Sequence, residues 1–220
     1  MYRILSLLTP EEVQQARAIA ATASFVDGRI TNPHNTAKQN EQLHEPAAYQ
    51  QSSALFQRAL LSSPEFHEFC FPAQMAPPML TRYRPGMQYG LHADVAYIEL
   101  PRGTLRSDIS CTIFLNDPAE YEGGALHVRI GDADLRFKLQ PGEAVLYPSN
   151  LLHEVEPVTR GERLVAITFI QSRIPDPQQR NLLFELNEVA ALEGLKMEPM
   201  NRARLELVRS NLQRLWGEQP

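Results

Sequence analysis

The sequence has 220 residues, of which 43% are hydrophobic and 21% charged, and 26 acidic against 21 basic side chains give a net charge of −5. This composition is typical of a folded globular protein and excludes wholesale disorder, collagen-like repetition and a coiled coil. No segment carries the basic charge that neutralises phosphate groups, so the sequence disfavours nucleic-acid binding.

The first residues carry no targeting or membrane signal. The apolar run from Ile4 to Leu8 is interrupted by Ser6 and followed by Pro10, so it is too short for a signal-peptide core or a membrane span. The only cysteines are Cys70 and Cys111, and two buried thiols are favoured over a disulfide. We therefore expect a cytoplasmic protein.

Residues 1–78 are expected to form an N-terminal helical segment that packs on the domain after it. Thr9 and Glu12 form a capping box around Pro10, which predicts that a helix begins there. Two more helices are predicted, over residues 47–61 and from Ser63 onward.

Residues 27–46 separate the first two of these helices and show a different composition. They are rich in Asn, Gln, Thr and His and have little apolar periodicity. We interpret this segment as a loop or irregular region, and one hypothesis is that it moves as a lid.

From residue 79 the pattern changes to short apolar runs separated by turn residues. Eight strands are predicted, over residues 79–84, 90–98, 110–115, 125–130, 135–139, 144–147, 153–158 and 164–171. No helix-length pattern lies between them, which favours an antiparallel barrel or jelly roll over a parallel α/β sheet. The expected fold is mainly β with flanking helices, with the barrel over residues 79–174.

Residues 175–220 are expected to form a C-terminal helical extension. Asp176 can cap a helix that ends near Gly194, and a last helix follows over the apolar positions from Leu205 to Leu215. An amphipathic helix must bury its apolar stripe, so these helices pack either on the barrel or on another copy of the protein. The sequence leaves both open, and a homo-oligomer through these helices is one expectation.

The residues that indicate chemistry lie on the predicted strands. His92 and Asp94 are two residues apart, so alternation along a strand points both side chains to one side. His153 lies on a later strand, and Arg163 follows it by ten residues. Two histidines and one carboxylate are the ligand set of non-haem Fe(II) oxygenases, which leave positions open for substrate and O₂. Taken singly, each of these residues is more typical of a hydrogen-bonded polar residue near a barrel mouth.

The run from Tyr83 to Asp94 resembles the Tyr-x-x-Gly-x-x-Tyr-x-x-His-x-Asp signature of prolyl-4-hydroxylase-type 2-oxoglutarate dioxygenases. Further matches follow in order at residues 106–112, 122–124, 141–149, 153–163 and 169–172. Together they resemble the bacterial PKHD-type hydroxylases, relatives associated with iron-uptake systems. The resemblance covers most of residues 79–190 and implies a double-stranded β-helix (jelly-roll) core.

The resemblance also implies roles for individual residues. His92, Asp94 and His153 correspond to the ligands of Fe(2+), and an intact carboxylate at Asp94 favours hydroxylation over halogenation. Arg163 corresponds to the arginine that pairs with the distal carboxylate of 2-oxoglutarate, a task that suits a planar guanidinium. Two side chains are implied as further co-substrate contacts, Tyr83 and, more weakly, Thr112. The family also implies L-ascorbate as a reductant.

The function implied is that of a 2-oxoglutarate-dependent non-haem iron dioxygenase. It uses O2 to hydroxylate an unactivated C–H bond of a small-molecule or peptide substrate, decarboxylates 2-oxoglutarate to succinate, and is linked to iron uptake or homeostasis. One alternative is a non-catalytic protein on the same fold that senses iron or 2-oxoglutarate, and another is a metal-dependent cupin enzyme without a 2-oxoacid. Arg106 and Asp108 are either a structural ion pair or a substrate-facing pair.

Overall fold

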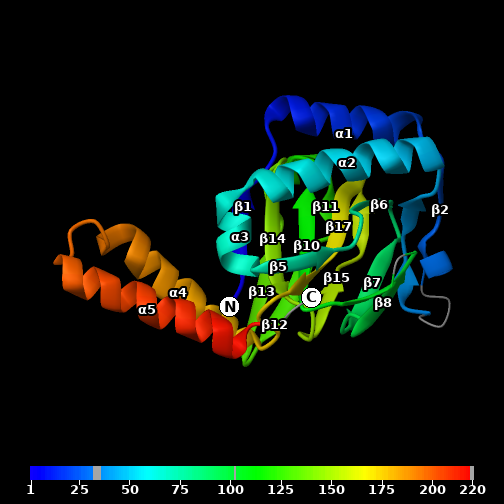
Figure 1. Ribbon diagram of the computed structural model, residues 1–220. Helices are drawn as coiled ribbons and strands as arrows, with labels where there is room; N and C mark the ends of the chain where they lie inside the picture. Colours follow the sequence, from blue (N-terminus) through cyan, green and yellow to red (C-terminus); the bar gives the residue numbers. More distant parts are fainter. Residues whose placement is uncertain (32–35, 102, 219–220) are drawn as a thin grey trace.

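The computed structural model describes residues 1–31, 36–101 and 103–218. Two antiparallel sheets face each other, three helices cover the outer face of the larger sheet, and a pair of helices extends away from the barrel (Figure 1). One hydrophobic core lies between the helices and the larger sheet, and a second lies between the two sheets. The prediction of a mainly β jelly roll with flanking helices is confirmed.

The larger sheet supplies the wall against which the helices pack. Its strands run in the order β1 (Arg3–Ser6), β14 (Glu143–Pro148), β10 (Ile109–Phe114), β17 (Arg163–Ser172), β6 (Met79–Tyr83), β4 (Glu41–Leu43) and β2 (Phe25–Asp27), with β5 (Pro72–Met75) paired to the far part of β17. The central strand β10 is buried along its whole length, as expected for a strand with a core on both faces.

The smaller sheet closes the other side of the barrel. Its order is β13 (Ala133–Phe137), β12 (Leu126–Ile130), β15 (His153–Val155), β7 (Gln88–His92) and β3 (Lys38–Gln39). A hairpin of β8 (Tyr97–Leu100) and β9 (Gly103–Arg106) lies beside it, and β11 (Glu122–Gly123) pairs with the distant β16 (Val158–Arg160) in a separate two-stranded sheet. Short 3₁₀ turns, η1 (Gly28–Thr31) and η2 (Pro118–Glu120), complete the connections.

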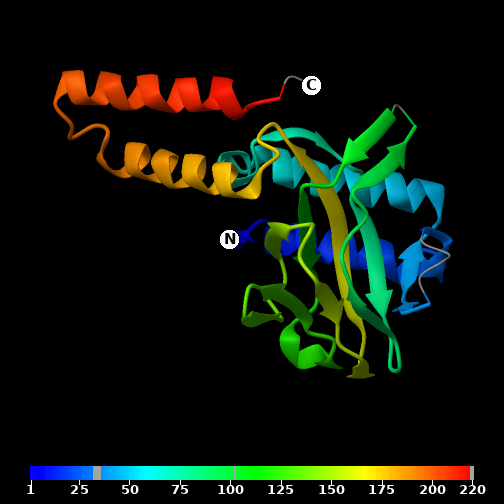
Figure 2. The ribbon, with the colours of Figure 1, turned by 90° about the horizontal axis from the view of Figure 1, so that it is seen from below.

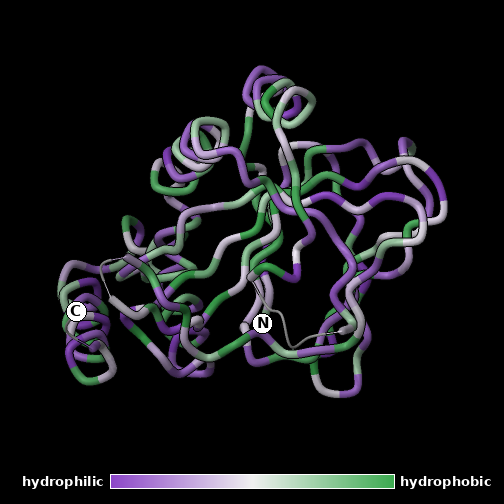
Figure 3. The backbone as a smooth tube through the Cα atoms, turned by 90° about the vertical axis from the view of Figure 1, so that its right-hand side faces the viewer, coloured by the Kyte–Doolittle hydropathy of each residue, from purple (hydrophilic) through white to green (hydrophobic). Residues whose placement is uncertain are grey.

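Helices α1 (Pro10–Thr22), α2 (Pro46–Ser62) and α3 (Pro64–Cys70) form the covering layer. The predicted capping box is present, because Thr9 accepts a hydrogen bond from the Glu12 amide and the Glu12 side chain accepts one from the Thr9 amide. The backbone tube coloured by hydropathy shows hydrophobic stretches along the strands inside the molecule (Figure 3). Cys70 and Cys111 are both buried free thiols, as expected.

The C-terminal extension is a helical hairpin of α4 (Pro177–Glu193) and α5 (Pro199–Trp216) that projects from the barrel (Figure 2). Asp176 caps α4 as predicted, since its carboxylate accepts hydrogen bonds from the first amides of the helix. No residue of α5 is buried, and several large apolar side chains of the hairpin are exposed, among them Leu192, Leu195, Leu207 and Leu215. Self-association through this hairpin stays a prediction.

Two predictions about residues 1–98 were wrong. The segment 27–46 is not simply a loop, because it contributes β3 and β4 to the two sheets. Part of the lid hypothesis falls on residues 32–35, which lie outside the described residues. The strand predicted over 90–98 is not continuous, because the chain leaves the smaller sheet after His92 and then forms the hairpin of β8 and β9.

Residues 1–78 also do more than cover the barrel. Besides the helices, this segment supplies β1, which pairs with β14, and β4, which pairs with β6. The boundaries predicted at residues 78/79 and 174/175 stay predictions. No helix in the described part of the chain is long and apolar enough to cross a membrane.

Candidate metal and co-substrate site

Three side chains that the sequence singled out meet inside the barrel. His92 ends β7, His153 begins β15, and the two residues face each other in the register of the smaller sheet. Asp94 lies two residues beyond the end of β7, so the fold, rather than strand alternation, brings it back to the histidines. One ligand atom of each residue lies within 4.8 Å of the others, which makes a group that could hold a metal ion.

The orientation of both imidazoles suits metal binding. The Nδ1 atom of His92 lies 2.8 Å from the Gly90 carbonyl oxygen, and that of His153 lies 3.0 Å from the Leu151 carbonyl oxygen. A carbonyl can only accept, so Nδ1 donates in each ring, and the lone pair of the neutral ring is then on Nε2. Both Nε2 atoms face Asp94, at 3.9 Å from Oδ1 for His92 and 3.5 Å from Oδ2 for His153.

Burial and neighbouring charge keep His92 neutral. Burial is the larger cause and the charge of His153 the second, and together they lower the pKa of His92 to about 4. A neutral imidazole at physiological pH is the form that binds a metal cation. The ring of Tyr89 stacks on that of His92, with centroids 3.6 Å apart, and restricts its rotation.

The carboxylate of Asp94 is held by residues that sequence reasoning did not find. Ser110 on β10 donates a hydrogen bond of 2.5 Å to Asp94 Oδ2, and the Ser110 and Ser149 hydroxyls lie 2.8 Å apart. Such outer partners fix the direction of a ligand carboxylate. A serine on a buried strand carries no sequence signal for this role.

Arg163 is a buried cation without a carboxylate partner. Its side chain is 1% exposed, and its Nε atom has no hydrogen-bond partner among the described residues. The guanidinium lies over the ring of Tyr83, 5.0 Å from its centroid, and over that of Phe114 at 5.4 Å. A buried guanidinium that pairs with no carboxylate in the described chain is costly, and an anionic ligand would offset that cost.

Tyr83 lies opposite Arg163 in the sheet, and its hydroxyl accepts a hydrogen bond from a residue that the sequence analysis did not single out. The two residues are direct partners in the pairing of β6 with β17. The amide of Asn40 donates a hydrogen bond of 2.9 Å to the Tyr83 hydroxyl oxygen. Burial raises the pKa of Tyr83, so the hydroxyl keeps its proton at neutral pH. Asn40 lies in the segment that the sequence analysis interpreted as a loop, which is why it was missed.

A cavity joins these groups. It is lined by the triad, by Arg163, Tyr83 and Thr112, and by further side chains from both sheets, including Ser110, Tyr147, Ile167 and Thr168. The structure therefore brings all six residues that the sequence singled out into one cavity. The turn that precedes Arg163 needs a glycine, because Gly161 has φ +74° and a Cβ there would lie 2.1 Å from the Glu120 carbonyl oxygen.

Arg106 and Asp108 lie outside this cavity and form an ion pair. Arg106 Nε donates to Asp108 Oδ1 at 2.7 Å and Nη1 donates to Glu218 at 2.7 Å. Asp108 also accepts a hydrogen bond from the Ser172 amide. Of the two interpretations left open, these contacts are those of a structural ion pair, which ties the end of α5 to the barrel.

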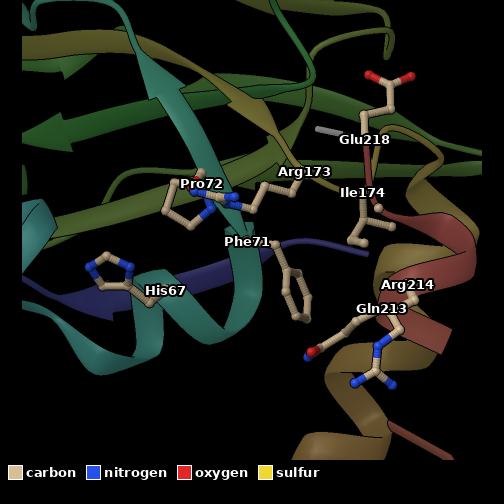
Figure 4. Close-up of a pocket in the computed structure, with 9 residues that line it drawn as sticks. His67, Phe71, Pro72, Arg173, Ile174, Gln213, Arg214 and Glu218 are labelled. Carbon is tan, nitrogen blue, oxygen red and sulfur yellow. The ribbon is translucent and has the colours of Figure 1, made fainter. Parts of the chain in front are cut away.

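A larger groove, of about 700 Å³, lies away from the triad. Its lining comes from α3, β5, the end of β17 and the end of α5 (Figure 4). It includes Phe71, whose φ of 45° is the one positive value at a non-glycine residue in the described chain. None of the triad residues lines it, so the predicted chemistry belongs to the smaller cavity.

Comparison with known proteins gives relatives along nearly the whole chain. The profile of the 2OG-Fe(II) oxygenase superfamily matches residues 78–171. A PKHD-type hydroxylase from Sphingopyxis alaskensis is 62% identical over 98% of this chain and 99% of that protein. Another from Nitrobacter winogradskyi is 39% identical over 99% of this chain and 100% of that protein.

Solved structures support the fold. A prolyl-4-hydroxylase from Pseudomonas putida aligns with a TM-score of 0.56 and 19% identity, over 78% of this chain and 92% of that chain. A prolyl hydroxylase from Trichoplax adhaerens, solved in complex with a peptide fragment, aligns with a TM-score of 0.57 and 15% identity, over 82% of this chain and 86% of that chain. At these identities the likeness shows the shared fold alone.

Proposed function

The chain belongs to the PKHD-type hydroxylases of the 2OG-Fe(II) oxygenase superfamily, and from this premise we propose that His92, Asp94 and His153 are the ligands of its iron. As a member, it is a 2-oxoglutarate-dependent dioxygenase that uses Fe(II) and 2-oxoglutarate. The donor set supports the proposal: two lone pairs and a carboxylate meet, and a hexacoordinate ion would keep three positions open.

We propose that Arg163 and Tyr83 hold the co-substrate in the same cavity. The observation that carries this step is the buried guanidinium of Arg163, which has no carboxylate partner in the described chain. A guanidinium can bind the distal carboxylate of 2-oxoglutarate through two parallel hydrogen bonds, and the Tyr83 hydroxyl can donate a third. Thr112, buried on β10 and lining the cavity, is proposed as a further contact.

When bound, Fe(II) and 2-oxoglutarate would let O2 act as the oxidant: one oxygen atom would enter the substrate C–H bond as hydroxyl, and the other would enter succinate as the co-substrate loses CO2. The residues of the chain bind these two groups and orient the side chains that hold them. The carbonyls of Gly90 and Leu151 fix the tautomer of the two histidines, and Ser110 directs the Asp94 carboxylate. The core between the sheets surrounds the cavity with apolar side chains, which limits the access of water.

The finer parts of the proposal concern the surroundings of the reaction. We propose a small-molecule or peptide substrate, L-ascorbate as a reductant, and a role linked to iron uptake in the cytoplasm. These parts rest on the family resemblance and not on a contact in this chain.

A turnover measurement separates an enzyme from a sensor on the same fold. Purified protein with Fe(II), ascorbate and 2-oxoglutarate in air is expected to form succinate slowly even without primary substrate, because the triad and Arg163 are both in place. Succinate is measured against time and compared with a sample kept anaerobic. Binding of 2-oxoglutarate without oxygen-dependent succinate would instead support the non-catalytic alternative.

Asn40→Asp is expected to weaken the use of 2-oxoglutarate. The Asn40 amide donates to the Tyr83 oxygen, so the Tyr83 proton points elsewhere and can be given to the co-substrate. An aspartate of the same shape accepts that proton instead and adds a buried negative charge. We expect KM for 2-oxoglutarate to rise about tenfold or more, with a smaller change in kcat, because a hydrogen bond to a charged group contributes about 1.5–3 kcal/mol.

The control is the same substitution at Asn187, whose side-chain oxygen accepts a hydrogen bond from Arg209. Asn187→Asp keeps that acceptor, so KM for 2-oxoglutarate should not move. In a Tyr83→Phe background, only the added charge of Asn40→Asp can act, so Asn40→Asp should raise KM less than it does in wild type. Full additivity of the two variants, or an unchanged KM in Asn40→Asp, would contradict the proposed role.

A further inference from the structure

A row of buried polar side chains runs from β3, through the residue between the two strands, to β4. Lys38, Asn40 and Gln42 are 5%, 4% and 2% exposed, whereas Gln39 between them is exposed. Side chains two residues apart on an extended chain share a face, so these three lie on the buried side of the segment. Asn40 bonds to Tyr83, and the Gln42 side-chain oxygen accepts from Thr31. Lys38 is the charged member of this row.

The ammonium of Lys38 has little to balance it. Its Nζ atom donates to Thr31 Oγ1 at 2.7 Å, and no carboxylate oxygen in the described ranges lies within ion-pair distance. An ammonium has three protons to donate, and buried lysines are rare unless they are paired. Burial lowers the pKa of Lys38 to about 8, although the charges of Asp94 and Asp27 act in the opposite direction. One hydrogen bond to a threonine hydroxyl does not offset the free-energy cost of burying the ammonium.

Lys38 lies beside the proposed iron site. It is the direct partner of Tyr89 in the pairing of β3 with β7, and its Nζ is 5.7 Å from the centroid of the Tyr89 ring. That ring stacks on His92. The charge of Lys38 is among the influences that lower the pKa of His92, and the Asp94 carboxylate acts on Lys38. The unbalanced cation therefore belongs to the surroundings of the reacting centre.

We propose that Lys38 binds a carboxylate of the primary substrate and so selects for an acidic substrate. This inference rests on the proposed function, in which both ends of 2-oxoglutarate already have partners: Arg163 at the distal carboxylate and the iron at the oxoacid end. No carboxylate of the described residues pairs with Lys38, so another molecule supplies the anion. The ammonium of Lys38 is a compact point charge and suits a contact with one carboxylate oxygen. The planar guanidinium of Arg163 suits a contact with both oxygens of a carboxylate.

The test compares the binding of a carboxylic acid with the binding of the corresponding neutral amide. Protein loaded anaerobically with Fe(II) and 2-oxoglutarate is titrated with N-acetylglycine and, separately, with N-acetylglycinamide, and binding is followed by ligand-observed NMR. Wild type should bind the acid about tenfold or more tightly than the amide, since a charge-assisted hydrogen bond is lost with the amide. Lys38→Met removes the charge and keeps much of the chain length, and it should reduce that preference to about onefold.

Two variants separate binding from structure. Lys196→Met removes an exposed lysine that pairs with Glu193 on the distant hairpin, and it should keep the wild-type preference. Thr31→Val removes the hydroxyl but leaves the ammonium, so it should keep the preference as well. If Lys38 serves only to tie β3 to Thr31, Thr31→Val and Lys38→Met should instead behave alike.

A second measurement distinguishes failure of the Lys38 inference from failure of the proposed function. It is the affinity for 2-oxoglutarate, followed by the visible absorption of its Fe(II) complex. It should be unchanged in Lys38→Met. A folded Lys38→Met protein that loses 2-oxoglutarate binding would overturn the inference, because the lysine would then serve the co-substrate. Equal binding of acid and amide by wild type, or no binding of the acid, would overturn it too. Absence of the Fe(II) complex in wild type would overturn the proposed function and this inference with it.

Discussion

Arg163→Met is expected to abolish measurable 2-oxoglutarate binding while Fe(II) still binds. Arg163 is 1% exposed, and its Nε atom has no partner among the described residues, so its pairing capacity is available to a ligand. Truncating one partner of a buried, hydrogen-bonded charge pair costs about 2–5 kcal/mol, which is roughly a 30-fold to more than 1000-fold loss in affinity. The dissociation constants for Fe(II) and for 2-oxoglutarate are measured anaerobically and separately.

Arg180 gives the matched control. It is also buried, at 4% exposed, but its guanidinium donates to the carbonyl oxygens of Ile174 and Pro175 at the start of α4. Arg180→Met should therefore lower stability and leave the affinity for 2-oxoglutarate unchanged. Arg163→Lys keeps the charge but not the planar fork, and we expect it to recover only part of the affinity. Wild-type affinity in Arg163→Met would show that Arg163 does not hold the co-substrate, whereas absence of 2-oxoglutarate binding in wild type would support the cupin alternative, in which no 2-oxoacid binds.

Strands of the barrel could be predicted because short apolar runs alternate with turn residues along this part of the sequence. Apolar runs bounded by Pro-Gly, Gly-Gly and Asn-Asp turns placed most of the eight predicted strands within a few residues of observed strands, as with β14 at Glu143–Pro148. The strand predicted over 153–158 was wrong, because it is divided between β15 and β16, which lie in different sheets. The strand predicted over 90–98 failed, because the register that brings Asp94 back to the histidines requires the chain to leave the sheet at His92. Tertiary geometry decided that break, not local propensity.

The three metal-ligand candidates and Arg163 could be predicted from residue type and order. The residues that hydrogen-bond to the site side chains and fix their orientation could not. Ser110 holds Asp94 from a strand 16 residues away, and nothing in a buried serine indicates its partner. Lys38 lies on a strand of two residues, and Asn40 lies between that strand and the next. The buried side chains of both residues are polar, so hydrophobic alternation gives no signal there. The segment that looked least ordered therefore supplies polar side chains that contact two residues of the cavity lining, Tyr83 and Tyr89.

His153→Ala is expected to remove the iron site. His153 supplies one of three ligand atoms that lie within 4.8 Å of one another, and its Nδ1 bond to the Leu151 carbonyl shows that Nε2 is the available atom. Loss of an outer partner of a ligand costs roughly 10–100-fold in metal affinity, and we expect loss of the ligand itself to cost more. In an anaerobic titration with Fe(II) and 2-oxoglutarate, the visible band of the complex should appear in wild type and be absent in the variant.

His127→Ala separates this loss from the general effect of removing a buried histidine. His127 lies on β12, next to β15, is 6% exposed, and has its Nε2 2.9 Å from the Glu156 carboxylate. It takes no part in the triad, so its variant should keep the visible band even if its melting temperature falls. A band of wild-type strength in His153→Ala would show that the metal binds elsewhere. Loss of the band in both variants, with both folded, would mean that the band reports the integrity of the smaller sheet and not ligation by His153.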